Sequence, residues 1–259
     1  MKKRILSMML TVVMIMSMAV LSGCGNSSEK KEDSKEEKTD EYTIGFSVST
    51  LSNPFFVTMS DAADAKAKEM GIKIETLDAE DSSETQAQQV EDLILKEVDL
   101  MIINPVDSDA IGTSIMACND ADIPVITVSR MANSGEVVQH LDIDNYEAGK
   151  LVAEQMIKDL GGKGKVAVLE GIPGASSTNE RQSGFEETLK KEAPDMEIVT
   201  SLTANYNREE GASVTEDILQ SNPELAAIYG HNDDMALGAV RSVEAAGKLE
   251  NLSLIHISE

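Results

Sequence analysis

From residue 43 onward, short apolar runs alternate with longer amphipathic segments, and this alternation most limits the folds open to the chain. The short runs are rich in Val and Ile and are bounded by turn residues, as buried strands are. The longer segments begin at helix-capping residues or at Pro, and several end at Gly, as helices do. The predicted elements of this first series are Thr43–Ser49, Pro54–Met70, Ile72–Leu77, Ser83–Lys96, Leu100–Ile103, Asp107–Asp120, Pro124–Val128 and a further strand at Val137–Leu141. This order of strands and helices is typical of a doubly wound parallel sheet.

A second series with the same element order begins at a long amphipathic helix, Asn145–Leu160. It continues as strand and helix in turn: Val166–Leu169, Asn179–Glu192, Ile198–Leu202, Arg208–Gln220, Ala226–Tyr229, Asp233–Ala246 and Leu252–Ile257. The polar segment Asp142–Asn145 is the expected crossing point between the two series. We therefore predict an α/β fold with two doubly wound parallel-sheet lobes joined by a hinge, residues 42–143 and residues 144–259.

The first 23 residues have the pattern of a secretory signal rather than of a folded domain. Lys2, Lys3 and Arg4 precede an apolar run from Ile5 to Leu21, which is short for a membrane span. The sequence LSGC that ends at Cys24 is similar to a bacterial lipobox, which implies that Cys24 carries lipid and becomes the mature N-terminus. The alternative is an ordinary signal followed by an incidental Cys.

Residues 24–41 are predicted to form a disordered tether. After Cys24 they consist of Gly, Asn, Ser, Lys, Glu, Asp and Thr, without apolar periodicity. One lipid on such a tether would hold the folded part of the chain at a membrane surface.

The charge of the chain argues against a nucleic-acid partner. The formal net charge is −24 at pH 7, and it becomes −27 once the three basic residues of the signal are removed. Such a surface repels nucleic acid and favours solubility, and we expect a monomer. After Cys24 the only Cys is Cys118, so no internal disulfide can form. Cys118 falls in a predicted helix and is expected to be a small buried residue.

The segment VSTLSNPFF, residues 48–56, is the first candidate for ligand binding. Asn53 and Pro54 favour a turn into a helix, so Phe55 and Phe56 follow the carboxyl end of a strand, where open α/β sheets bind ligands. Aromatic rings beside an amide suit a sugar, which has apolar C–H faces and a rim of hydroxyls. The alternative is that the Phe residues are core, but adjacent helical residues point in different directions, so hardly both can be core.

Further polar or aromatic side chains follow five of the other predicted strands. They are Asn104, Ser129, Arg130, Arg181, Tyr206 and Asn232. Their recurrence at the same edge of both predicted sheets indicates one ligand crevice. The alternative for each is a capping or turn role, and Asn232 and Asp107 both look like helix N-caps.

The sequence shows no catalytic constellation, so we expect neither an enzyme nor a cofactor. The three His residues lack metal-ligand spacing, and no nucleophile elbow, phosphate loop or dinucleotide fingerprint follows a strand. The glycine-rich run at residues 161–164 ends a predicted helix and precedes a strand, which is the wrong order for cradling a phosphate.

Several of these segments resemble the bacterial periplasmic ribose-binding protein family, whose members supply sugars to ABC transporters. The resemblance is carried by VSTLSNPFF, INPVDSDAIG, ADIPVITVSR, ERQSGF around Arg181, and HNDDMALGAV with the RSVEAAGK that follows it. It runs from about Tyr42 to Lys248. It implies two α/β lobes with a three-segment hinge that close on one small-molecule sugar, and an ABC transporter permease as partner. It also implies an extracytoplasmic protein anchored to the cell membrane by lipid.

The resemblance further implies roles for the candidate residues. Rings at Phe55 and Phe56 would face the sugar, and its hydroxyls would be bonded by Asn53, Asn104, Arg130, Arg181 and Asn232. Two positions depart from the family pattern. Ser129 stands where ribose binders carry Asp, and Tyr206 stands where Phe is frequent, so a different pentose, a hexose or another polyol is an open alternative.

Relatives of this family also continue beyond the last predicted strand, so we expect the returning hinge segments and closing helices of both lobes to be missing here. A ligand-sensing repressor shares the two-lobe core, but it would need an N-terminal DNA-binding head in place of the signal. A membrane-anchored sugar sensor that presents ligand to a chemotaxis receptor or a sensor kinase is the second alternative to transport.

Overall fold

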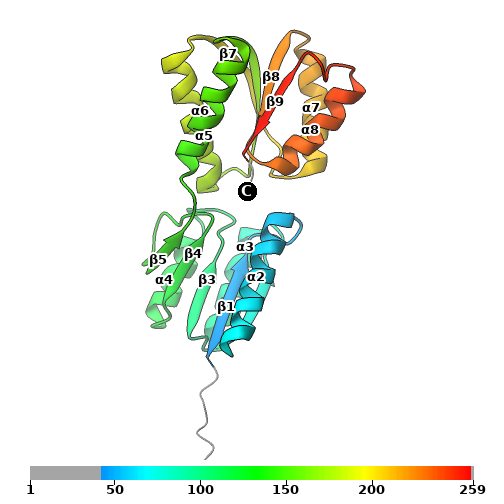
Figure 1. The fold of residues 1–259 in the computed structure, drawn as a ribbon. Coiled ribbons are helices and arrows are strands. Elements are labelled where there is room, and N and C mark those ends of the chain that lie inside the picture. The colour runs from blue at the N-terminus through cyan, green and yellow to red at the C-terminus, as the bar shows by residue number, and fades with distance from the viewer. Residues whose placement is uncertain (1–41, 258–259) are drawn as a thin grey trace, which may run out of the picture. The chain divides into compact units, whose positions relative to one another are not determined.

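The computed structural model describes residues 42–257, and Figure 1 shows their arrangement. The predicted signal at residues 1–23, the lipid site at Cys24 and the tether at residues 24–41 lie outside the described residues. The described part contains two separate parallel sheets, which confirms the predicted α/β class with two sheet-based lobes.

The first sheet has five parallel strands in the order β2-β1-β3-β4-β5. Its strands are β1 (Thr43–Val48), β2 (Lys73–Asp78), β3 (Leu100–Ile103), β4 (Val125–Val128) and β5 (Gln139–Leu141). Its helices are α2 (Pro54–Met70), α3 (Ser83–Leu95) and α4 (Gly112–Asp120). Phe56 of α2 packs with Phe46 and Val48 on one face, whereas α3 and α4 share a core with β3 on the other. Both faces are therefore covered, as a parallel sheet requires.

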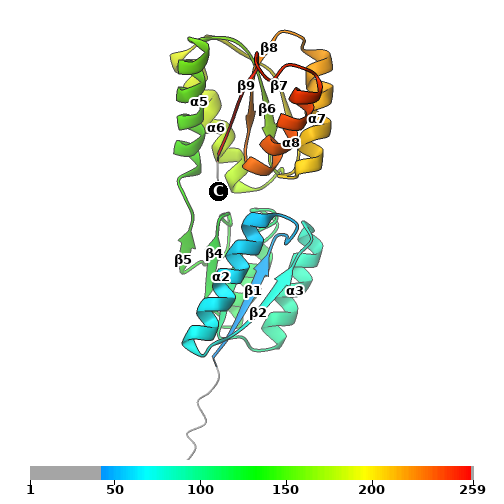
Figure 2. The same cartoon turned by 45° about the vertical axis from the view of Figure 1, so that its right-hand side comes forward.

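The second sheet has four parallel strands in the order β7-β6-β8-β9. Its strands are β6 (Lys163–Glu170), β7 (Asp195–Thr203), β8 (Leu225–Gly230) and β9 (Ser253–His256). Its helices are α5 (Asn145–Leu160), α6 (Ser176–Glu192), α7 (Arg208–Ser221) and α8 (Asp233–Ala245). Figure 2 shows α5 and α6 on one side of this sheet and α7 and α8 on the other.

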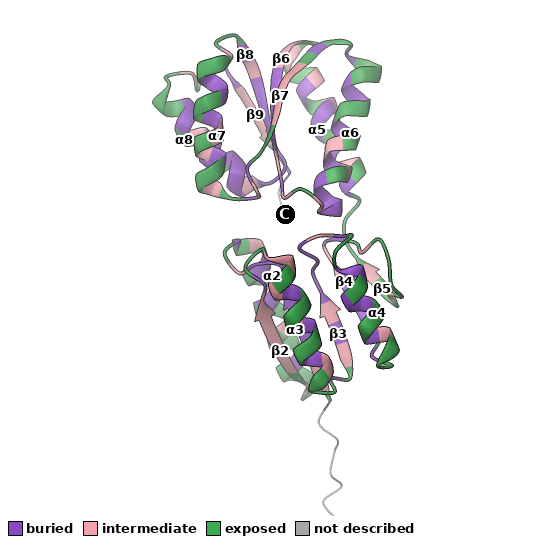
Figure 3. Ribbon diagram, turned by 180° about the vertical axis from the view of Figure 1, so that it is seen from behind, coloured by how far each residue is buried: buried purple, intermediate pink, exposed green. Residues whose placement is uncertain are grey.

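The period-two alternation of a strand explains this layering. In β6, Val166 and Val168 join the core formed with α5 and α6, whereas Ala167 and Leu169 join the core formed with α7 and α8. Figure 3 shows the same pattern as buried residues along the strands and exposed residues on the outer faces of the helices. Cys118 is buried in the core of the first sheet, as predicted.

Two helix starts differ from the sequence prediction. α4 begins at Gly112 rather than Asp107, because the Asp107 carboxylate accepts the N–H groups of Asp109 and Ala110 and so closes a separate turn. α6 begins at Ser176 rather than Asn179. The helix α3 begins at Ser83 as predicted, and Ser82 is its N-cap. By contrast, the predicted cap at Asn232 is confirmed, since its side chain accepts the Met235 N–H.

The chain passes from the first sheet to α5 through Asp142–Asp144, where the predicted lobe boundary falls. The Asp144 side chain accepts the Glu147 N–H and caps α5, and Gly161, at φ 67°, ends that helix in the left-handed conformation. The strand β6 then starts at Lys163, three residues before the predicted start.

Candidate functional site

A cavity of about 290 Å³ lies at the carboxyl ends of strands from both sheets. It is lined by Thr50, Ser52, Asn53, Pro54, Phe56, Asp81, Arg130, Ile172, Asn205, Tyr206, Asn207, Arg208, Glu209 and Asp234. The residues up to Arg130 follow β1, β2 and β4, and the others follow β6, β7 and β8. This is the edge at which open parallel sheets form ligand crevices.

Arg130 is the central charged group of the cavity. Its side chain is buried, and its Nη1 donates to the Pro105 carbonyl oxygen at 3.0 Å. Its guanidinium carbon lies 5.3 Å from the Phe56 ring centroid and 5.5 Å from that of Tyr206. The guanidinium thus lies against one ring from each sheet, within the range of cation–π attraction.

The two adjacent Phe residues play different parts. Phe56 is buried, packs with Phe46 and Val48, and also lines the cavity. Phe55 is half-buried, meets Phe56 edge to face at 5.1 Å between ring centroids, and lines a neighbouring cavity of about 260 Å³. Phe56 is therefore both a core residue and part of the cavity wall. The sequence analysis had treated these two roles as alternatives.

Asn53 sets the start of α2 at the cavity edge. Its side-chain Oδ1 accepts the Phe55 N–H at 2.9 Å, so it caps the helix and lines the cavity at the same time. Pro54, the first residue of the helix, has no N–H to satisfy there.

Four candidate residues lie near this edge without lining the cavity. Asn104 is buried, accepts the Ser49 N–H and donates to the Val128 carbonyl, so it ties the ends of β1 and β4 to β3. Ser129 has a left-handed backbone at φ 62° just before Arg130. Asn232 donates to the Tyr206 carbonyl at 3.5 Å besides capping α8.

Arg181 is the fourth of these residues. Its Nε donates to Asn145 Oδ1 at 2.9 Å and its Nη1 donates to the His231 carbonyl at 2.6 Å. Its guanidinium carbon lies 5.9 Å from the Tyr206 ring centroid. The guanidinium of Arg181, like that of Arg130, therefore lies within cation–π range of the Tyr206 ring.

The cavity also contains charged side chains outside the set of candidate residues. Arg208 binds Asp234 through Nε at 2.9 Å and through a second, shorter contact from Nη2. Asp81 follows β2, and partial burial of its carboxyl raises its pKa, while the positive charge of Arg130 opposes the rise. The residue as a whole is exposed, so solvent weakens both effects. The signal that could have found Asp81 is its place after β2, a strand end for which the sequence analysis named no candidate.

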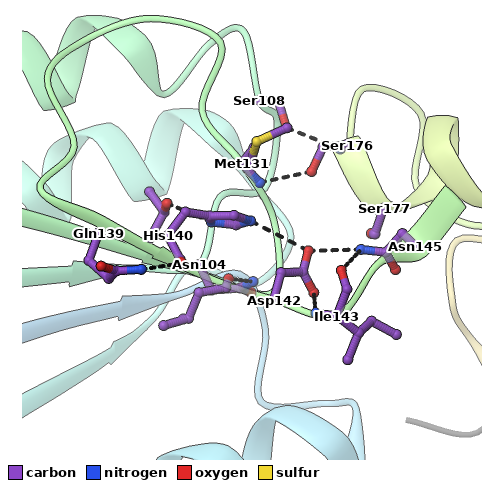
Figure 4. Close-up of polar contacts among 12 residues, drawn as sticks. Asn104, Ser108, Met131, Gln139, His140, Asp142, Ile143, Asn145, Ser176 and Ser177 are labelled. Atoms are coloured by element: carbon purple, nitrogen blue, oxygen red, sulfur yellow. Dashed lines mark hydrogen bonds and ion pairs between the residues drawn. The ribbon is translucent and has the colours of Figure 1, made fainter. Parts of the chain in front are cut away.

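Hydrogen bonds join the two sheet regions beside the cavity. The Ser176 N–H donates to Ser108 Oγ at 3.1 Å, and Ser176 Oγ accepts the Met131 N–H at 2.8 Å. Figure 4 shows these contacts and, nearby, Asp142 between His140 and Asn145. The Asn145 amide donates to Asp142 at 2.8 Å, so the crossing segment is itself held by polar contacts.

Within residues 42–257, no cluster of His, Cys, Asp and Glu is placed to hold a metal ion. The helices in the same range include none with the length and hydrophobicity of a membrane span.

Comparison with known proteins agrees with this architecture. A family model for the periplasmic binding protein domain matches residues 44–257. The ribose import binding protein of Bacillus subtilis is 39% identical over 239 residues, which are 92% of this chain and 77% of that protein.

Two solved structures share the fold. An ABC transporter periplasmic solute binding protein from Actinobacillus succinogenes with bound D-allose is 33% identical, with a TM-score of 0.75 over 83% of this chain and 77% of that one. The fructose-binding periplasmic domain of a hybrid two-component system is 27% identical, with a TM-score of 0.80 over 83% of this chain and 72% of that one. The chain therefore belongs to the periplasmic binding protein family, as a relative of the ribose-binding proteins.

Proposed function

We propose that this chain captures a monosaccharide, a ribose-like pentose or a related sugar, in the cavity formed by Phe56, Arg130 and Tyr206. The observation that carries the proposal is the make-up of the wall, in which two rings and a guanidinium face one small space. Rings suit the C–H faces of a sugar, and a planar fork of N–H donors suits its neighbouring hydroxyl oxygens. The similarity to binding proteins for ribose and D-allose supports this ligand class.

The size of the cavity supports a small ligand. At about 290 Å³ it lies at the lower end of the ~300–1,000 Å³ that is usual for ligand pockets. No catalytic role is proposed, because the relatives are binding proteins and the chain is a solute-binding protein of their family rather than an enzyme.

The candidate residues divide into two groups under this proposal. Asn53, Phe56, Arg130 and Tyr206 would contact the sugar, since they line the cavity. Phe55 would contact a part of the ligand that reaches the neighbouring cavity. Asn104, Ser129, Arg181 and Asn232 remain predictions as ligand-contacting residues. The contacts of Asn104, Arg181 and Asn232 support a role in positioning the wall.

Delivery and anchoring are further parts of the proposal. We infer that the bound sugar is handed to an ABC transporter permease outside the cytoplasm, while lipid on Cys24 holds the protein at the cell membrane. The lipobox-like sequence that ends at Cys24 supports the anchor. Mass spectrometry of the mature protein should find lipid at Cys24, and Cys24→Ala should leave the membrane fraction. An unmodified Cys24 with unchanged fractionation would refute the anchor.

A sensing role is the alternative, and one observation favours it. The fructose-binding domain that shares this fold belongs to a two-component system rather than to a transporter. Deleting the gene should abolish uptake of the radiolabelled ligand if the protein serves transport. Unchanged uptake, with loss of a transcriptional response to the same sugar, would favour sensing.

The binding proposal is tested by calorimetric titration of the purified full chain with D-ribose, D-allose and D-fructose. Phe56→Leu keeps apolar volume in the core but removes the ring, so binding of the preferred sugar should weaken by about 2 kcal/mol. Val57→Ala, at an exposed position of the same helix, is the matched control and should bind as the wild type does. If no monosaccharide binds, or if Phe56→Leu binds within twofold of the wild type, the proposed site is wrong.

A further inference from the structure

Tyr206 is the one cavity residue whose side chain carries both a ring and a hydroxyl, and its hydroxyl points away from the cavity toward α6. Thr178 Oγ1 donates to the Tyr206 hydroxyl oxygen at 2.9 Å, and Ser177 Oγ lies 3.1 Å from the same oxygen. All three residues are buried, with 6% or less of their surface exposed. The phenol of Tyr206 is therefore enclosed by protein hydroxyls.

Both hydrogen-bonding contacts of the Tyr206 hydroxyl are made with protein hydroxyls. Thr178 donates to the Tyr206 oxygen, and either Tyr206 or Ser177 can donate across the second contact. When the phenolic proton goes to Ser177 Oγ, the Tyr206 hydroxyl has both a donor and an acceptor partner inside the protein. What Tyr206 presents to the cavity is the face of its ring.

The backbone conformation at Tyr206 also requires surrounding contacts to stabilise it. Asn205 and Tyr206 are both left-handed, with φ 50° and φ 56°, although neither is Gly. Consecutive residues of this kind cost free energy and persist only where surrounding contacts fix them. Asn232 donates to the Tyr206 carbonyl at 3.5 Å, so a side chain holds the backbone end of the residue while two hydroxyls hold the ring end.

The Tyr206 ring also packs closely against Gly171. A Cβ at this position would lie 2.1 Å from Cζ of Tyr206 and 2.5 Å from Oγ1 of Thr178. Real carbon atoms do not approach that closely, so any side chain at Gly171 would push the ring out of place. The ring thus lies directly over the backbone of the loop that follows β6.

We propose that Ser177 and Thr178 are positioning residues that hold the Tyr206 ring as an apolar wall of the ligand cavity, so that the site selects ligands presenting a C–H face there. The proposal rests on the proposed function and deepens it. On this proposal, the Tyr206 hydroxyl fixes the position of the ring within the protein. The ligand contacts only the aromatic ring, as it would contact the ring of Phe. A sugar gains ring contact at this wall, and it gains no hydrogen bond from the phenol.

A set of three variants separates this proposal from a direct bond between the phenol and the ligand. Tyr206→Phe leaves two buried hydroxyls without their partner, and Ser177→Ala with Thr178→Val leaves the phenol without its partners. The triple variant, with all three changes, removes every group of the network and leaves nothing unpaired. Thr188→Val, which removes a buried hydroxyl that donates to the Gly184 carbonyl within α6, is the matched control.

The first readout is calorimetric affinity for the best of D-ribose, D-allose and D-fructose. Tyr206→Phe and the double variant should each bind about tenfold more weakly than the wild type, because a buried polar group without its partner disturbs the wall. The triple variant should return to within about threefold of the wild type, and Thr188→Val should not change affinity. A triple variant as weak as Tyr206→Phe would show that the phenol bonds the ligand and would overturn the proposal, as would wild-type affinity in all variants.

The second readout needs no ligand, so it keeps the proposal testable if the proposed function fails. The chain has four Tyr and no Trp, so near-ultraviolet circular dichroism of the free protein reports mainly on tyrosine environments. The double variant should alter this spectrum and lower the melting temperature by about 3–8 °C, whereas Thr188→Val should leave the spectrum unchanged. The triple variant should recover the melting temperature. A double variant with the wild-type spectrum and melting temperature would refute the positioning role whether or not a sugar binds.

Discussion

At the scale of single residues, the site depends on polar groups that are buried behind the cavity wall. His231 is fully buried, with Nδ1 accepting the Gly171 N–H at 3.3 Å and Nε2 lying 2.9 Å from Gln182 Oε1. Its ring also lies 4.9 Å from that of Tyr229. His231 therefore supports from behind the same loop on which the Tyr206 ring lies.

Burial of His231 predicts a pH dependence of stability. Burial, and secondarily the charge of Arg181, lowers the pKa of His231 to about 3, from about 6.5 in an unfolded chain. Between these values the unfolded state binds the extra proton, so the free energy of unfolding falls as pH falls from 6.5 toward 3. From pH 7 to pH 4 this single group should remove about 3 kcal/mol.

Urea unfolding of the wild type and of His231→Gln at pH 7 and pH 4 checks this prediction. Gln keeps a donor and an acceptor without titrating, so the loss of stability between the two pH values should be about 3 kcal/mol smaller in the variant. His256→Gln, at an exposed position, is the control and should behave as the wild type does. Equal losses in His231→Gln and the wild type would contradict the prediction.

At the scale of elements, close helix pairs cover both faces of the second sheet. In the pair α5 and α6, Gly149 and Gly184 each lie against the backbone of the other helix. A Cβ at Gly149 would lie 2.1 Å from the Arg181 carbonyl oxygen, so this approach also helps to set the position of Arg181, whose guanidinium carbon lies 5.9 Å from the Tyr206 ring centroid. The distance between α5 and α6 therefore affects where Arg181 lies relative to Tyr206.

Gly184→Ala should destabilise the protein, although Ala is normally about 1 kcal/mol better than Gly within a helix. The new Cβ would lie 2.0 Å from the Tyr146 carbonyl oxygen, and backbone atoms cannot move aside without separating the helices. We expect a net loss of about 2 kcal/mol or more, measured as a lower melting temperature.

The control for this change is Gly71→Ala at the end of α2, where no atom lies within 4 Å of the new Cβ. The left-handed backbone there, at φ 69°, should cost only about 1 kcal/mol. If Gly184→Ala is as stable as the wild type, the two helices can separate freely and the close approach is not required.

At the scale of the whole molecule, the net charge of −24 opposes compaction. Like charges on a folded protein lie closer together than on an unfolded chain, and dissolved salt screens them over about 10 Å at 0.1 M. The same charge repels nucleic acid.

The melting temperature should therefore rise by a few degrees between about 10 mM and 200 mM NaCl at pH 7, where the Debye length shortens severalfold. The same salt step near pH 4.4, the isoelectric point from the sequence, should have a smaller effect because the net charge is then near zero. Differential scanning calorimetry at both pH values provides the test. An equal or opposite effect at pH 7 would mean that net repulsion does not limit stability.

The order and type of the elements could be predicted from the sequence because their signals are local. Apolar period and caps such as Asn53, Gly161 and Asn232 are set by residues within a few positions of one another. The missed start of α4 has a local cause as well, since Asp107 uses its carboxylate in a turn that competes with the helix.

Only the tertiary structure decided which polar residues face the cavity. The sequence placed Asn104 and Arg130 after neighbouring strands alike, yet Asn104 ties strand ends together while Arg130 lies between two rings. It likewise gave no sign that the Tyr206 hydroxyl would meet Ser177 and Thr178, 29 and 28 positions away. These outcomes depend on side chains from distant segments that meet at one sheet edge, and the direction in which each side chain then points is fixed by partners that no local pattern specifies.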